Sequence, residues 1–315
     1  GAARAHLERD QPRPERGRTR GAGTRSRRRG RRPRVAGVRP RQARRRPSPP
    51  SRKSAAIGSR GASAPSGGSI SAAHAPRACA AGAIVIDNTS EFRYRDEYPL
   101  VVPEVNAHRL EGLGPGALIA NPNCSTIQMV VALHPIHKKY GIKRIVVSTY
   151  QAVSGTGKKA IDELFDQSRA MINFLNYEKK VYPHRIAFNC LPHIDAFLDN
   201  GYTKEEMKMV NETRKILEDD TIGVTATTVR VPVFYSHSES VNVETREPIS
   251  ASEVKLLLEK SPGIKVMDDP EKNIYPLATD GAGQDLTLVG RIREDESVAN
   301  VINMWIIADN IRKGA

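Results

Sequence analysis

A cysteine at the start of a predicted helix is the residue best placed to do chemistry in this sequence. Cys124 follows the turn-forming triplet Asn121-Pro-Asn123 and precedes a Ser/Thr pair and an apolar run with helical spacing. A thiol at this position feels the positive end of the helix dipole and lies near free backbone N–H groups, which together stabilise a thiolate. The position predicts a nucleophile, with the alternative that Cys124 is a small buried hydrophobic residue.

An arginine and a histidine in the segment RVPVFYSHSE could bind a carboxylate and move a proton beside it. Alternation along a strand places Arg230 at the start of this segment and His237 just beyond the strand's end. Taken alone, a surface ion pair for Arg230 and a loop position for His237 are the more common outcomes.

A glycine-rich turn supplies the next candidates. Gln151 opens the sequence QAVSGTG, and its neutral amide could orient a substrate without altering the charge of a thiolate. The pair Ser154-Gly155 would let the backbone approach a planar ring. The alternative is an ordinary loop between a strand and a helix.

Three charged residues complete the set. Glu212 and Lys215 share one face of a predicted helix, where the default interpretation is a solvated ion pair that contributes little stability. The functional interpretation is that they present opposite charges to a zwitterionic substrate. Arg93 lies in a loop after a predicted strand, where it could hold an anion.

Alternating strands and helices must position these residues. Thr203 and Ser250 are predicted N-caps, and Glu206 completes a capping box with Thr203. The pattern favours an α/β unit followed by an α+β unit built on a sheet. Predicted strands span 81–87, 118–120, 142–149, 225–233, 240–244, 264–267 and 286–292, predicted helices span 158–174, 204–217 and 250–258, and 304–311 fits either type.

The formal net charge of +14 is concentrated near the start of the sequence. Residues 1–65 contain 21 of the 49 Lys and Arg residues and 3 of the 35 Asp and Glu residues, a local charge of +18. Residues 66–315 therefore carry a charge of −4, as expected of an ordinary, slightly acidic soluble protein.

Residues 1–65 are rich in Arg, Pro, Gly and Ser and are predicted to be disordered, because they cannot bury enough apolar surface. The lack of interleaved aromatic residues for base stacking disfavours a basic arm for nucleic acid. A transit peptide would need an amphipathic apolar face. The favoured interpretation is that the segment is not part of the fold and reflects a wrong reading frame, a mis-assigned start or a fusion.

The number of cysteines and the hydropathy of the sequence indicate the cellular compartment of the protein. Cys79, Cys124 and Cys190 are odd in number and match no metal-binding spacing, which predicts reduced thiols in the cytoplasm and no metal site. No run of 18 apolar residues is present, so no membrane span is expected.

Ordered sequence blocks across residues 66–315 resemble the aspartate-semialdehyde dehydrogenase family. In family order the blocks are GGSIS, AAGAIVIDNTSEFR, PLVVPEVNAH, ANPNCSTIQM, TYQAVSGTGKKAIDEL, FNCLPHID, ETRKIL, RVPVFYSHSESVNVE, VGRIRED and ADNIRKGA. The resemblance implies NADPH-dependent reduction of aspartyl phosphate to aspartate semialdehyde and phosphate, in the biosynthesis of lysine through diaminopimelate, threonine and methionine.

The resemblance also implies catalytic roles. Cys124 would form a thioester with the acyl group, His237 would act as general acid and base, and Gln151 would orient the acyl group.

Substrate-binding roles follow from the same resemblance. Arg230 would clamp the substrate carboxylate and Glu212 would meet its ammonium group. Arg93, Asn123 and Lys215 would form the phosphate site.

The family fold combines an NADP-binding Rossmann domain with an α+β substrate and dimerisation domain of the glyceraldehyde-3-phosphate dehydrogenase-like kind, and it forms homodimers. The expected division is 1–65 outside the fold, 66–120 a partial Rossmann domain, 121–299 the catalytic and dimerisation domain, and 300–315 the return to the Rossmann domain. The positions that match the family's cofactor site are Gly67, Gly68, Ser154, Gly155 and Asn310.

Two alternatives stay open. The related reductases that act on N-acetyl-glutamyl phosphate share the thioester chemistry, but the blocks around Cys124 and His237 favour the aspartyl enzyme. A frame-disrupted, inactive product or a basic nucleic-acid-binding arm is the alternative from another class.

The sequence departs from the family at the cofactor loop. No strand, GxGxxG turn and helix occur in succession before residue 66, although such a loop normally holds the pyrophosphate. We therefore expect this 315-residue chain to bind NADPH weakly or not at all. Isothermal titration calorimetry checks this expectation, and binding in the micromolar range would contradict it.

Overall fold

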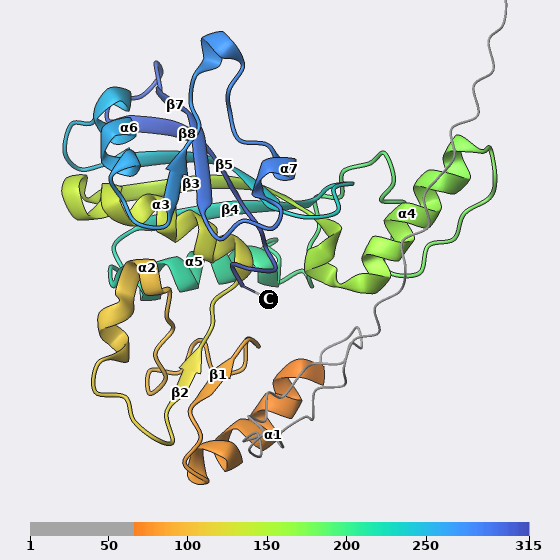
Figure 1. Ribbon diagram of the computed structural model, residues 1–315, viewed down its shortest axis with the longest axis horizontal. Helices are drawn as coiled ribbons and strands as arrows, with labels where there is room; N and C mark the ends of the chain where they lie inside the picture. The colour runs from red at the N-terminus through yellow and green to blue at the C-terminus, as the bar shows by residue number, and fades with distance from the viewer. Residues whose placement is uncertain (1–65, 315) are drawn as a thin grey trace, which may run out of the picture. The chain divides into compact units, whose positions relative to one another are not determined.

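The computed structural model describes residues 66–314, and the segment 1–65, for which the sequence predicts disorder, lies outside them. Within the described residues the strands form a two-stranded sheet and a six-stranded sheet (Figure 1). The mixed arrangement of helices and strands confirms the predicted α/β class. In this part of the chain, no helix is long and apolar enough to cross a membrane.

The smaller sheet pairs β1 (Val85–Asp87) with β2 (Leu118–Ala120) in parallel. Helix α1 (Ser66–Ala80) packs against both strands, as helices do on parallel sheets. Sequence analysis did not predict α1, because Pro76 and a pair of glycines are poor helix formers. The short helices α2 (Pro103–Asn106) and η1 (Ala107–Leu110) lie between the two strands in sequence.

Helix α3 (Cys124–Tyr140) connects the smaller sheet to the larger one. It is buried along most of its length, and its apolar side chains join one large core with those of the six-stranded sheet. A helix that is apolar on nearly all sides belongs inside a protein. Burial on this scale fixes the position of Cys124 at its first turn.

The larger sheet has the strand order β4-β3-β5-β8-β7-β6. The pairs β3–β4 and β6–β7 are parallel and the others are antiparallel. Its last strand in sequence ends at Ala308, so the sheet continues past residue 299, where the sequence suggested a boundary. The strands are β3 (Ile142–Gln151), β4 (Gly223–Arg230), β5 (His237–Thr245), β6 (Ile264–Val266), β7 (Thr287–Glu294) and β8 (Val301–Ala308).

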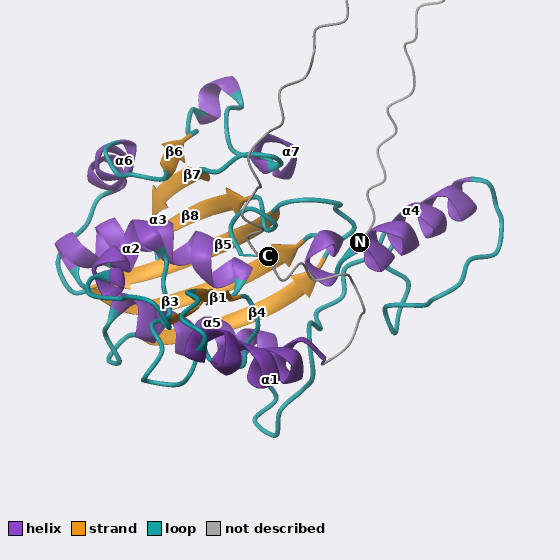
Figure 2. Ribbon diagram, turned by 60° about the horizontal axis from the view of Figure 1, so that its bottom comes forward, coloured by secondary structure: helices purple, strands orange, loops and turns teal. Residues whose placement is uncertain are grey.

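Helices α3 and α5 (Lys204–Leu217) lie across one face of this sheet (Figure 2). The predicted capping box of α5 is confirmed, with the Glu206 backbone N–H donating to Thr203 and the Thr203 N–H donating to the Glu206 carboxylate. Ser250 caps α6 (Ala251–Glu259) as predicted. The remaining short helices are η3 (Pro270–Lys272) and α7 (Ala278–Gly281).

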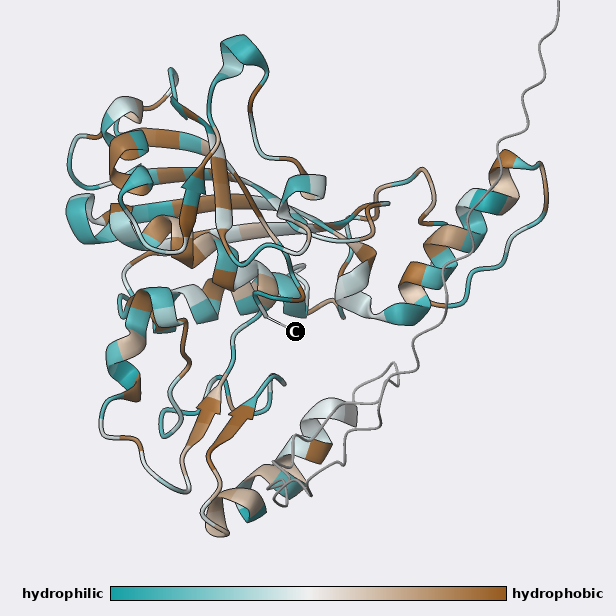
Figure 3. Cartoon of the chain, in the orientation of Figure 1, coloured by the Kyte–Doolittle hydropathy of each residue, from teal (hydrophilic) through white to brown (hydrophobic). Residues whose placement is uncertain are grey.

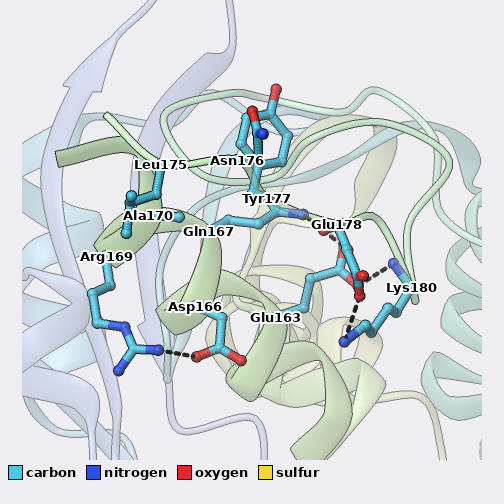
Figure 4. A pocket seen from close by; sticks show the side chains of 10 residues that line it. All are labelled: Glu163, Asp166, Gln167, Arg169, Ala170, Leu175, Asn176, Tyr177, Glu178 and Lys180. Atoms are coloured by element: carbon cyan, nitrogen blue, oxygen red, sulfur yellow. Dashed lines mark hydrogen bonds and ion pairs between the residues drawn. The ribbon is translucent and has the colours of Figure 1, made fainter. Parts of the chain in front are cut away.

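Helix α4 (Lys158–Ile172) and the loop after it form an arm beside the sheet, reached through η2 (Val153–Thr156) (Figure 1). The arm has a small core of its own. Brown segments at the far end of the arm in Figure 3 mark apolar residues. Phe174, which follows α4 in sequence, is 97% exposed. A pocket of about 250 Å³ lies between α4 and its loop, and none of the predicted site residues lines it (Figure 4).

Candidate active site

Cys124 is the first residue of α3, so the predicted turn-to-helix junction is confirmed. Asn123 is the N-cap, and its Oδ1 accepts hydrogen bonds from the backbone N–H groups of Ser125 at 3.0 Å and Thr126 at 3.3 Å. These bonds satisfy donors that the first helical turn leaves free. Consequently the cap residue that fixes the helix start also fixes the thiol.

The environment of Cys124 favours the thiol over the thiolate. Burial, and next the negative charge of Glu205, raise the pKa of Cys124 to about 12, although Arg230 lowers it. Gly314 lies directly against the cysteine, since a Cβ built on Gly314 would be 2.7 Å from the Cys124 Cα. Burial therefore opposes the stabilisation of a thiolate that the sequence predicts from the helix terminus.

His237 is the first residue of β5 and is fully buried. Its Nδ1 accepts a hydrogen bond from the backbone N–H of Ala152 at 3.0 Å. Because a backbone N–H can only donate, the ring proton of neutral His237 must be on Nε2. Burial, and then the charge of Arg230, hold the pKa of His237 well below 6.5, so the ring is neutral.

Nε2 of His237 has no hydrogen-bond partner among residues 66–314. A buried N–H group without a partner carries a cost that a bound acceptor would remove. This nitrogen is consequently a donor available to a ligand.

Arg230 is the last residue of β4, and its Nη1 donates to the carbonyl oxygen of Ala152 at 2.7 Å. The prediction that the strand containing Arg230 continues toward His237, which lies just beyond its end, is wrong: β4 ends at Arg230 and His237 is the first residue of β5. Pro232 in the connection cannot donate to a sheet, which helps to end β4.

The sheet order brings the two residues together. Strand β3 lies between β4 and β5, and its last residue, Gln151, is paired with Arg230. Gly155 lies against both side chains. A Cβ at that position would be 3.1 Å from Nη1 of Arg230 and 3.2 Å from Nε2 of His237. A Cβ here would be tight against both side chains, which would have to move by a few tenths of an ångström to admit it.

Glu205 is a functional candidate that sequence reasoning missed. Its Oε1 accepts from Nδ2 of Asn123 at 2.9 Å and from Nε2 of Gln151 at 3.3 Å. An acidic residue in the first turn of a helix is ordinarily explained by the helix dipole, so its sequence position gave no signal.

Arg93 and Glu212 form a buried ion pair with 3.0 Å between Nη1 and Oε1. The other oxygen of Glu212 accepts from the backbone N–H of Asn123 at 2.6 Å, and Nη2 of Arg93 donates to the Asn88 carbonyl at 2.8 Å. Glu212 therefore supports the N-cap of α3. Lys215 is turned to the carbonyl of Arg95 at 2.7 Å, instead of pairing with Glu212 as a solvated helical pair would.

The five predicted cofactor residues fall into two groups. Oδ1 of Asn310 accepts from the Ser154 hydroxyl at 3.0 Å and from the backbone N–H of Ser236 at 3.1 Å. Its Nδ2 is buried without a partner among the described residues. Gly155 is adjacent to Ser154, whereas the pair Gly67 and Gly68 lies in the first turn of α1, near Thr89 and Glu91.

Together these residues can perform acyl chemistry on a thiol. Cys124 supplies a nucleophile, His237 a neutral N–H donor and Arg230 a fixed positive charge. Asn123 and Gln151 supply amides held by one carboxylate. A positioned donor and a positive charge are what a developing oxyanion and a substrate carboxylate require.

Comparisons with known proteins agree with this chemistry. The family model described as "Semialdehyde dehydrogenase, dimerisation domain" matches residues 133–313, and "Semialdehyde dehydrogenase, NAD binding domain" matches residues 63–113. The aspartate-semialdehyde dehydrogenase of Legionella pneumophila is 56% identical over 251 residues, which are 79% of this chain and 72% of that protein. The enzyme of that name from Bacillus subtilis is 49% identical over 258 residues, covering 79% and 74% of the two chains.

Solved structures agree as well. The crystal structure of aspartate semialdehyde dehydrogenase II from Vibrio cholerae, complexed with ASA, superimposes with a TM-score of 0.75 at 52% identity. The match covers 79% of this chain and 73% of that one.

The buried pair of Arg93 and Glu212 gives a stability prediction. We expect Glu212→Gln to lower the free energy of unfolding by about 3–5 kcal/mol, because it leaves the buried guanidinium without a countercharge. Urea unfolding measures the change. Lys143→Ala is the control: it breaks a pair with Glu244 of 2.7 Å at a lysine that is 62% exposed, and should cost less than about 1 kcal/mol. Similar losses in both variants would contradict the prediction.

Proposed function

The chain belongs to the aspartate-semialdehyde dehydrogenase family of oxidoreductases, and from that premise we propose how its residues reduce aspartyl phosphate to aspartate semialdehyde through a thioester. The observation that carries the proposal is the pair of hydrogen bonds made by the backbone of Ala152. The N–H of Ala152 fixes His237 and its carbonyl fixes Arg230. These residues lie beside Gln151, where β3 and β4 end. This arrangement aims a proton donor and a guanidinium at one small region.

The first step is acyl transfer to Cys124. The Sγ atom bonds to the acyl carbon, the bond from that carbon to the phosphate oxygen breaks, and the products are a thioester and inorganic phosphate. The thiol proton must leave at the same time, because the raised pKa of Cys124 keeps the free protein in the thiol form. His237 cannot receive it at Nε2, which already carries a proton in the tautomer that Ala152 selects. The departing phosphate is the acceptor that balances the step.

We propose that His237 acts as a hydrogen-bond donor in every step of the reaction. Its Nε2–H can bind the carbonyl oxygen of the acyl group and stabilise the negative charge that develops there. The low pKa of His237 suits this role, because the ring donates one hydrogen bond without first being charged. Of the general acid and base roles expected for His237, we propose only that its Nε2–H donates a hydrogen bond.

Substrate binding falls to the charged residues near the thiol. Arg230 is positioned to bind the substrate carboxylate, and its buried Nε has no partner among residues 66–314. For Arg93, Asn123 and Lys215 the proposed role is the phosphate site, although both Nη atoms of Arg93 already donate within the protein. The proposed contact of Glu212 with the substrate ammonium requires that its bonds to Arg93 and Asn123 be shared.

NADP is the proposed cofactor, and the residues near His237 fit its nicotinamide end. Nδ2 of Asn310 is a buried donor without a partner among the described residues, as a carboxamide site needs. Ser154 orients Asn310 through its Oδ1, and Gly155 lets the backbone approach closely. When bound, the cofactor supplies the hydride that reduces the thioester carbon. We assign Gly67 and Gly68 to the same cofactor only as a proposal from the family resemblance.

A homodimer is the proposed assembly. The face of the large sheet opposite α3 carries half-exposed aromatic residues, including Tyr150 and Trp305, whose ring centroids are 5.3 Å apart. The arm adds exposed apolar side chains such as Ile172 and Phe174. Exposed apolar surface of this kind is typical of interfaces. We further propose that the semialdehyde serves lysine, threonine and methionine biosynthesis.

The thioester mechanism predicts the effect of removing the nucleophile. We expect Cys124→Ala to lower the rate of phosphate-dependent NADP⁺ reduction by the semialdehyde by at least about 10³-fold, because no acyl group can be held. Cys190→Ala removes an exposed thiol and is expected to retain full activity. Intact-mass measurement after addition of aspartyl phosphate tests acyl transfer without the cofactor. Undiminished activity of Cys124→Ala would remove the mechanism.

The close approach of Gly155 gives a second prediction. We expect Gly155→Ala to lower kcat/KM by about 10- to 100-fold, because the added methyl group displaces Arg230 and His237, while the melting temperature changes little. Gly114→Ala is the matched control, since a Cβ there meets no atom within 4 Å. Steady-state kinetics of the two variants make the comparison, and equal activities would show that the close approach is unimportant.

A further inference from the structure

The buried carboxylate of Glu205 has no part in the chemistry described so far, yet it contacts two residues that do. We propose that Glu205 is a positioning residue for acyl transfer, which orients the amides of Asn123 and Gln151 through one shared carboxylate oxygen. The inference rests on the proposed function only in taking Cys124 as the nucleophile. Glu205 lies in the first turn of α5 and is 6% exposed.

The shared oxygen fixes which way each amide points. An ionised carboxylate only accepts hydrogen bonds, so both amides must turn their NH₂ groups toward Oε1 of Glu205. The oxygen of Asn123 is then directed to the N–H groups of α3, where it is observed as the cap. Without this acceptor, either amide could rotate by half a turn at little steric cost.

For Gln151 the consequence concerns the substrate. Its Nε2 donates to both Thr149 and Glu205, each at 3.3 Å. Both amide hydrogens are therefore engaged inside the protein, and the amide oxygen is the group left to face a substrate. An oxygen acceptor near Cys124 suits an ammonium group or a hydrogen-bond donor of the substrate and would repel an oxyanion.

The second oxygen of Glu205 anchors the carboxylate. Nζ of Lys208 lies 3.1 Å from this oxygen and 2.8 Å from Oδ2 of Asp195. Burial would lower the pKa of Lys208, but Glu205 and Asp195 outweigh it and the pKa is raised, so the ammonium stays charged. These side-chain contacts run from Gln151 through Glu205 and Lys208 to Asp195, which is near the surface.

Glu205 also affects the thiol through its charge. The charged groups that face Cys124 are Glu205 from α5, Arg230 from the end of β4 and Arg93 from the loop after β1. The ring of His237, from β5, is neutral. Burial is the main reason that the pKa of Cys124 is raised, and Glu205 adds to it by opposing the two guanidinium groups. The charge of Glu205 therefore opposes thiolate formation at the same residue that orients the amides.

Glu205→Gln separates this proposal from a structural role. We expect the rate of alkylation of Cys124 by iodoacetamide at pH 8 to rise about tenfold, because loss of a nearby negative charge lowers the thiol pKa by about one unit. We expect kcat to fall about tenfold or more, because glutamine offers one acceptor oxygen in place of two, for which the two amides and Lys208 then compete. Mass spectrometry of the Cys124 peptide measures alkylation in the full chain. A thiol that becomes more reactive while turnover becomes slower is the expected signature.

Glu205→Asp tests orientation without the change of charge. The shorter carboxylate keeps its charge but withdraws from the two amides, so alkylation should stay within about twofold of the wild type. The value of kcat should again fall about tenfold. This variant also carries the test if Glu205→Gln does not fold, which circular dichroism reports. Full turnover in Glu205→Asp would overturn the positioning role.

Asp195→Asn is the matched control. Asp195 pairs with the same lysine but makes no contact with Asn123 or Gln151. Alkylation and kcat should both remain within about twofold of the wild type. An unchanged alkylation rate in Glu205→Gln, or an equal gain in Asp195→Asn, would overturn the proposal. Failure of the proposed function is seen separately, as activity that survives in Cys124→Ala.

Discussion

The backbone of one residue holds the site together: Ala152, directly after β3. Its N–H donates to His237 and its carbonyl accepts from Arg230, so the two peptide groups on either side of one Cα set both side chains. The two residues come from β5 and β4, the neighbours of β3 on either side. The register of the sheet therefore sets the geometry of the site. Any shift of β3 against its neighbours would displace the donor His237 and the cation Arg230 together.

This constraint also sets the protonation state of the site. Because the Ala152 N–H selects the His237 tautomer, the ring presents a proton toward Gly155 and has no lone pair to offer there. Desolvation keeps Cys124 a thiol and His237 neutral. The free protein thus stores no thiolate–imidazolium pair. Reactivity must develop when an acyl phosphate, which brings its own proton acceptor, enters the site.

Local signals in the sequence predicted local structure well. The Thr203 cap of α5, the Ser250 cap of α6 and the helix start at Cys124 all follow from bonds between residues within one turn. The position of His237 relative to Arg230 was predicted wrongly, because strand alternation was continued through a connection that leaves the sheet. Sheet order, which places β3 between the two strands, is not visible in any local pattern.

Ion pairs between residues far apart in sequence were the least predictable part of the site. One of them connects the loop after β1 in the smaller sheet to α5 on the larger sheet. Arg93 follows β1, Glu212 lies on α5, and 119 residues separate this buried pair. A carboxylate at Glu212 or Glu205 resembles any solvated helical acid in sequence, since only folding removes its water. Once buried, Glu212 binds the backbone of Asn123 and Glu205 binds its side chain. The cap before Cys124 is consequently held by two carboxylates from one helix, so the thiol's position depends on the charge balance of α5 as well as on α3.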